Sequence, residues 1–82
     1  MSKYYKTANF YQSTFLFSKG LELISVDRTD PKKCEFVFAD TPERELLVGV
    51  FNFSKENDPE TMVDFRKAVL AIKTLKNALH QP

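Results

Sequence analysis

Two apolar-rich runs separated by a polar turn constrain the fold of this chain more than any other feature. The first run covers residues 21–26, the second covers residues 34–39, and the segment between them contains Asp30 and Pro31. Proline fixes its own φ angle and disfavours the helical region for the residue before it, so Asp30-Pro31 is typical of a turn. The segment therefore predicts an antiparallel β-hairpin, flanked on both sides by helical patterns.

Three helices are predicted around this hairpin from capping residues and apolar spacing. The first covers residues 8–19, with Thr7 as its N-cap and Gly20 just beyond its end. The others are expected over about 42–52 and about 59–79, and each is opened by an aspartate followed closely by a proline.

These elements predict an α+β fold in one domain that spans residues 1–82. In the predicted order α-β-β-α-α, the antiparallel β-hairpin packs against the three helices. Residues 3–6 also fit a third short strand at the N-terminus, with Tyr4 and Tyr5 pointing to opposite faces. No internal repeat or linker divides the chain.

The composition argues against several classes of protein. The single cysteine, Cys34, cannot form a disulfide within the chain, and its alternation with Phe36 and Phe38 predicts a buried thiol. The single histidine, His80, lies near the C-terminus, and two glycines are too few for a phosphate-binding loop. We therefore expect a protein that is not an enzyme and has no metal, no cofactor and no small-molecule substrate.

The apolar runs are short. None approaches the roughly 20 residues of a membrane span, and the first six residues lack the apolar core of a signal peptide. Because a lone cysteine suits a reducing compartment, we expect a cytoplasmic protein that does not contact the membrane.

Large aromatic residues are more numerous than one buried helix face accommodates. The chain has eight Phe and three Tyr, and several crowd into the first helix, where Gln12 and Ser13 are expected to face water. This helix is either a core helix between two layers or partly exposed at a contact surface. We predict a module that binds a protein partner or a second copy, forming a homo-oligomer, with interface candidates Tyr4, Tyr5, Phe10, Tyr11 and Phe17.

Charge is unevenly distributed along the chain, although the net charge is only +1. Residues 40–64 carry seven acids and two bases, whereas the residues after them carry four bases and no acid. These bases border an apolar stripe, predicted to face the core, that includes Phe65 and Leu75. A solvated helix face is the simpler interpretation. The alternative function is nucleic-acid binding through Lys3, Lys6, Arg66, Lys73 and Lys76.

Three segments of the chain carry a family resemblance. They are residues 4–7 with Phe10-Tyr11 and Lys19-Gly20, the hairpin runs 23–28 and 36–40, and the closing pattern of Pro59, Phe65, Ala68 and Leu75-Lys76. Together they resemble a small family of bacterial and phage single-domain proteins, a domain of unknown function. The resemblance implies a free-standing domain of bacterial or phage origin, and it implies no catalytic residue and no substrate.

Overall fold

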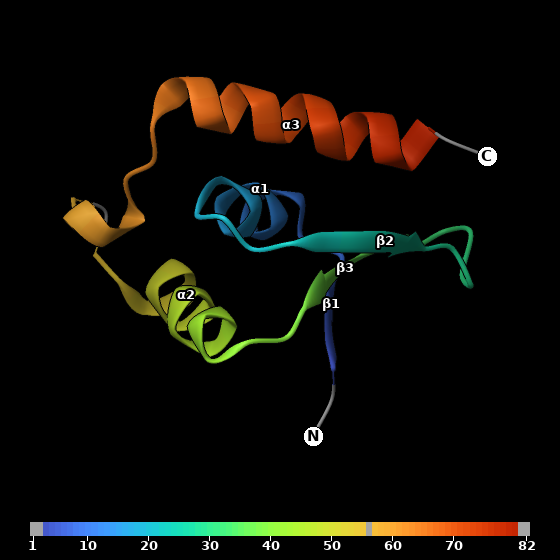
Figure 1. Cartoon of the computed structure of the whole chain (residues 1–82), viewed down its shortest axis with the longest axis horizontal. Helices are drawn as coiled ribbons and strands as arrows, with labels where there is room; N and C mark the ends of the chain where they lie inside the picture. Colours follow the sequence, from blue (N-terminus) through green and yellow to red (C-terminus); the bar gives the residue numbers. More distant parts are fainter. Residues whose placement is uncertain (1–2, 56, 81–82) are drawn as a thin grey trace.

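The structure is a computed structural model that describes residues 3–55 and 57–80. Within these residues it is an α+β fold with a three-stranded antiparallel sheet (Figure 1). The fold class is therefore confirmed, whereas the predicted order α-β-β-α-α omitted the first strand. The elements are β1 (Tyr4–Thr7), α1 (Phe10–Ser18), β2 (Leu23–Asp27), β3 (Glu35–Ala39), α2 (Pro42–Phe53), the 3-10 helix η1 (Pro59–Thr61) and α3 (Phe65–His80).

The sheet has the strand order β1-β3-β2, so β3 is the central strand. The predicted hairpin is confirmed as β2 and β3, and an irregularity at Ile24 shifts the register of β2. The third strand is also confirmed, and it pairs with β3 rather than with β2. Leu23 from β2 and Tyr5 from β1 both lie opposite Phe38. The central strand thus has apolar neighbours on both sides.

The core lies between this sheet and α1. Phe36 and Phe38 are buried on one face of β3, and they belong to a single apolar cluster with Phe15, Leu16 and Leu75. Helix α1 lies between α2 and α3 and contacts both (Figure 1). Of the two possibilities predicted for this helix, the structure supports the core helix between two layers.

Helix α1 begins two residues later than predicted. Asn9 is its N-cap instead of Thr7, because Oδ1 of Asn9 accepts a hydrogen bond of 3.0 Å from the backbone N–H of Gln12. Thr7 is instead the last residue of β1. The C-terminal end agrees with prediction, since Gly20 has a φ of 98°, a left-handed conformation that glycine adopts without strain.

Two polar residues of α1 that were predicted to face water are buried. The hydroxyl of Tyr5 donates a hydrogen bond of 2.9 Å to Oε1 of Gln12. The hydroxyl of Ser13 donates one of 2.8 Å to the backbone oxygen of Asn9. Both residues are buried. Because a buried polar group is tolerated when it has a partner, the prediction based on polarity alone was wrong.

The long C-terminal helix that was predicted is divided into two helices. The 3-10 helix Pro59–Thr61 ends first, and α3 begins only at Phe65. Between them, Val63 packs against the core cluster. Oδ1 of Asp64 accepts a hydrogen bond of 2.8 Å from the backbone N–H of Arg66. The capping side chain of Asp64 and the packing of the partly buried Val63 explain why one continuous helix does not form.

The buried face of α3 differs from the predicted stripe. Ala71 and Leu75 are fully buried, whereas Phe65, which the stripe placed in the core, is 81% exposed. Alanine is small, and it lets α3 approach α1 closely along this face. Placing Phe65 in the core was therefore wrong.

The turn between β2 and β3 is attached to the end of α3. The guanidinium of Arg28 donates a hydrogen bond of 2.7 Å to the backbone oxygen of Leu79 and another to that of Ala78. The last carbonyl groups of a helix lack partners within the helix and carry partial negative charge. Arg28 therefore stabilises this helix end, a role that its place in a charged turn did not indicate.

Candidate protein-interaction surface

The predicted interface residues on α1 and β1 have different surroundings. Phe10 and Phe17 are partly buried against the core cluster, and the Phe10 ring meets Phe36 edge-on with 6.0 Å between ring centroids. Tyr11 is 80% exposed, and Tyr4 is about half exposed. Of these four, Tyr4 and Tyr11 thus present the most surface to a partner.

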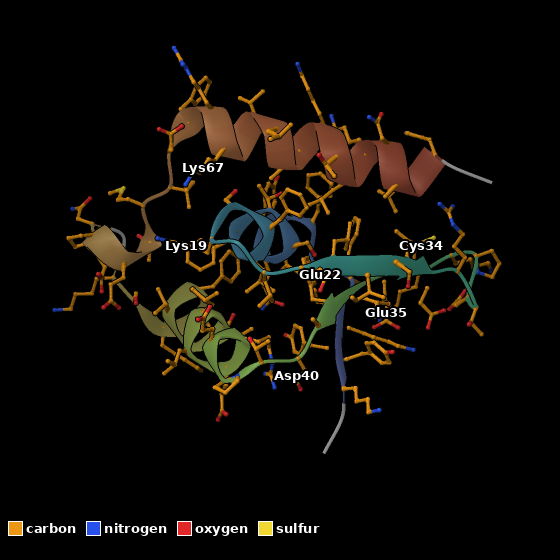
Figure 2. The ribbon with its side chains drawn as sticks, viewed as in Figure 1. Lys19, Glu22, Cys34, Glu35, Asp40 and Lys67 are labelled. Atoms are coloured by element: carbon orange, nitrogen blue, oxygen red, sulfur yellow. The ribbon has the colours of Figure 1, made fainter. Side chains whose placement is uncertain are left out.

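Tyr5, the fifth predicted interface residue, joins three elements of the fold. Its hydroxyl contacts Gln12 in α1, and its ring lies 4.5 Å from the guanidinium carbon of Arg44 in α2. Arg44 in turn donates hydrogen bonds of 2.8 and 3.3 Å to the carboxylate of Asp40, which Figure 2 shows near the start of α2. This carboxylate raises the pKa of Arg44 further. The side chain of Tyr5 is therefore engaged within the fold.

The predicted nucleic-acid-binding residues do not form one surface. Arg66, Lys73 and Lys76 are exposed on α3, whereas Lys3 and Lys6 lie beside and within β1, on the other side of α1 (Figure 1). Of the five predicted residues, the three on α3 thus remain together on one helix.

Lys6 has an ionic partner on another strand of the sheet. Its Nζ lies 2.7 Å from Oδ2 of Asp27 in β2. Lys6 lies opposite Val37 in the register, so this ion pair crosses the central strand. Hydrogen bonds from Lys6 and Thr29 hold the pKa of Asp27 well below its usual range, and the same pair raises the pKa of Lys6.

An apolar stripe with acidic borders faces outward on α2. Leu46 is 71% and Phe53 is 85% exposed. They are seven residues apart and therefore lie on one side of the helix, with Gly49 between them. Glu43 and Glu45 are exposed beside this stripe. We call Glu43, Glu45, Leu46, Gly49 and Phe53 the α2 outer face. Glu60 and Lys19 line a hollow next to Leu46, so one base also borders this face.

A corresponding face on α3 is apolar with basic borders. Phe65 and Leu70, the latter 60% exposed, lie beside Arg66 and Lys73. These four residues and Val69 line a shallow hollow of about 300 Å³. We call them the α3 outer face.

A second hollow lies on the other side of Leu70. It measures about 380 Å³ and extends from α3 to the C-terminal end of α1. Lys19 and Lys67, both labelled in Figure 2, line it together with Phe17. Leu70 thus separates two hollows that are both bordered by bases.

Groups with catalytic chemistry are not gathered at these faces. Cys34 is partly buried just before β3, not fully buried as expected, and His80 is the exposed last residue of α3. Across residues 3–55 and 57–80, no group of three or more His, Cys, Asp or Glu is placed to hold a metal ion.

Sequence reasoning missed Leu46, Phe53 and Leu70 because it assigned surplus apolar surface to the N-terminal aromatics. One signal was present in α2, where the adjacent Leu46 and Leu47 lie about 100° apart around the helix, so that one of them can face away from the core. For Leu70 the signal was weaker, because the buried face of α3 depends on where that helix begins.

Within the described part of the chain, no helix combines the length and apolar character needed to cross a membrane.

Comparisons with known proteins identify the family of this chain but no individual relative. No curated protein and no solved structure matches the chain. A family model described as a domain of unknown function, DUF5659, matches residues 2–80, which is nearly the whole sequence. The chain therefore belongs to the DUF5659 family.

Proposed function

We propose that this protein is a non-enzymatic module that binds another protein chain. The observation that carries the proposal is the exposure of four large apolar side chains, between 60% and 85%, on the outer faces of α2 and α3. Contiguous apolar surface with a polar border is typical of protein interfaces, and aromatic residues are enriched there. The four side chains are Leu46, Phe53, Phe65 and Leu70.

The proposed interface lies on α2 and α3, whereas the sequence predicted it among the N-terminal aromatics. Tyr5, Phe10 and Phe17 support it least, because much of their surface is used in contacts within the chain. Tyr4 and Tyr11 remain as an alternative surface on the other elements. The two surfaces can be distinguished by substituting one residue in each.

A pull-down with matched variants tests the proposal. The tagged chain, Leu70→Glu and Tyr11→Glu are each incubated with an extract of the organism that encodes the chain. Both substitutions add one acid at an exposed apolar position, so neither is expected to disturb the core. We expect a protein retained by the wild type and by Tyr11→Glu but lost with Leu70→Glu. Equal capture by all three chains, or no capture, would contradict the proposal.

Nucleic-acid binding is the second candidate, with α3 as its surface. Arg66 and Lys73 border the exposed ring of Phe65, and bases beside an aromatic ring suit single-stranded nucleic acid. Lys6 adds little support, because its amine is paired with Asp27. Fluorescence anisotropy with labelled single-stranded DNA and RNA at low salt tests whether the chain binds nucleic acid. We expect no binding, and binding that Lys73→Glu abolishes would favour this candidate instead.

We also propose an origin and a cellular compartment for this protein. The family resemblance supports a bacterial or phage origin, and the lone Cys34 supports a reducing compartment such as the cytoplasm.

A further inference from the structure

The outer faces of α2 and α3 are complementary in charge. On α2 the exposed charges, Glu43 and Glu45, are acidic, because the single base Arg44 turns inward to Asp40 and Tyr5. All four charged side chains of α3 are basic and exposed. Each face also carries two large exposed apolar side chains. A surface that would bind the α3 outer face is therefore present elsewhere on the same chain.

We propose that the α2 outer face of one copy packs on the α3 outer face of a second copy. The partner follows from this complementarity, since acidic borders meet basic borders while the apolar stripes are removed from water. The inference rests on the proposed function and names its partner as a second copy of this chain.

Gly49 gives a separate reason to expect a neighbour on α2. Glycine within a helix is destabilising by roughly 0.5–1 kcal/mol relative to alanine. A methyl group added at Gly49 would meet no atom within 4 Å, so packing within the chain does not require glycine there. Between Leu46 and Phe53, a residue without a side chain allows another helix to approach closely. Contact with a second copy explains this otherwise unfavourable residue.

Each face also has relief that a second helix can fit. Leu46 and Phe53 are separated by about 10 Å along the α2 axis, at 1.5 Å per residue, with Gly49 between them. Leu70 borders two hollows, one within the α3 outer face and one shared with the C-terminal end of α1. In the proposed contact, Leu70 is directed at the gap above Gly49.

Each copy carries both faces. Helix α1 lies between α2 and α3 (Figure 1), and Lys19 at its C-terminal end lines one hollow with Leu70 and another with Leu46. Two copies can therefore form the contact twice, in a two-fold dimer, or once, head-to-tail, which produces a closed ring or an open chain of copies. Removing either face should therefore leave the other one able to bind.

Charge exchange tests this arrangement by sedimentation velocity. One chain carries Glu43→Lys and Glu45→Lys, and the other carries Arg66→Glu and Lys73→Glu. We expect each variant alone to be monomeric, with association weakened by about tenfold or more. An equimolar mixture should associate again, because the unchanged acidic α2 of the second variant meets the unchanged basic α3 of the first, and the two altered faces are also complementary in charge. A mixture that stays monomeric would overturn the proposal.

A second variant separates loss of binding from loss of folding. Gly49→Gln fills the gap on α2 with a better helix former, so the monomer should melt no earlier than the wild type. We expect this variant to lose association. Unchanged association would overturn the proposal, as would a wild type that stays monomeric at every concentration. In that last case, capture of a different protein that Leu70→Glu abolishes would leave the proposed function standing.

Discussion

The β1 and α1 side of the molecule and the outer faces of α2 and α3 use similar residues in different ways. On the first side, Tyr5 contacts Gln12 and Arg44, and Lys6 pairs with Asp27. On the outer faces, Phe53 and Phe65 are more than 80% exposed. Aromatic content alone therefore does not locate an interface, because burial and pairing decide which side chains remain available.

The largest expected effect comes from making one chemical change in both regions. Phe38 is fully buried, so Phe38→Ala should lower the free energy of unfolding by about 3–5 kcal/mol. Phe53→Ala should change it by less than about 0.5 kcal/mol, because that ring is exposed in the monomer. Urea denaturation at low protein concentration measures both. Similar losses in the two variants would remove the distinction between the regions.

Tyr5→Phe tests whether this tyrosine serves the fold. The substitution keeps the ring beneath Arg44 but leaves Oε1 of the buried Gln12 without its hydrogen-bond donor. An unsatisfied buried polar group costs about 1–3 kcal/mol, so the variant should be less stable by an amount in that range. Tyr11→Phe is the matched control, and equal stability of the two variants would contradict the assignment.

The two glycines should respond to alanine with opposite signs. Gly20→Ala places a side chain at a φ of 98°, which should cost about 1–2 kcal/mol. Gly49→Ala should instead stabilise the monomer by about 0.5–1 kcal/mol, because the added methyl group meets nothing and alanine favours helix. Thermal unfolding of the two variants measures the difference. A destabilised Gly49→Ala would mean that this glycine serves the fold of the monomer.

The smallest effect concerns pH. The pKa of Asp27 is lowered by Lys6, so this pair stabilises the fold above the ordinary aspartate pKa of about 3.9. That stability is lost as the pH falls further and Asp27 becomes protonated in the folded state. Lys6→Gln should therefore show a smaller loss of stability than the wild type between pH 5 and about pH 2. Parallel pH profiles for the two proteins would show that the ion pair contributes nothing.

Much of the fold could be predicted from the sequence. The hairpin followed from two apolar runs around Pro31, and the start of α2 followed from Asp40 and Pro42. Thr41, which lies between them, is the N-cap, and its side chain accepts a hydrogen bond from the N–H of Arg44. These signals are local in the chain. The break before α3 could not be predicted in this way, because it depends on Val63 reaching a core built from distant residues.

The interaction surface was harder to predict for the same reason. Which face of α3 is buried depends on how α3 packs against α1. That packing leaves Phe65, in the first turn of α3, exposed to solvent. Tyr5 was predicted to lie at an interface. Its partners Gln12 and Arg44 come from other elements, so the pattern around Tyr5 did not indicate them. Sequence periodicity describes one element at a time, whereas these contacts join several.

The central claim is that the outer faces of α2 and α3 bind each other between copies of the chain. Its most direct test is an amide NMR spectrum of the isotope-labelled chain recorded at increasing protein concentration. The claim predicts chemical-shift changes that grow with concentration at Leu46, Gly49, Phe53 and Leu70, while the amides of Tyr4 and Tyr11 stay unchanged. Changes confined to β1 and α1, or a spectrum that does not depend on concentration, would contradict the claim.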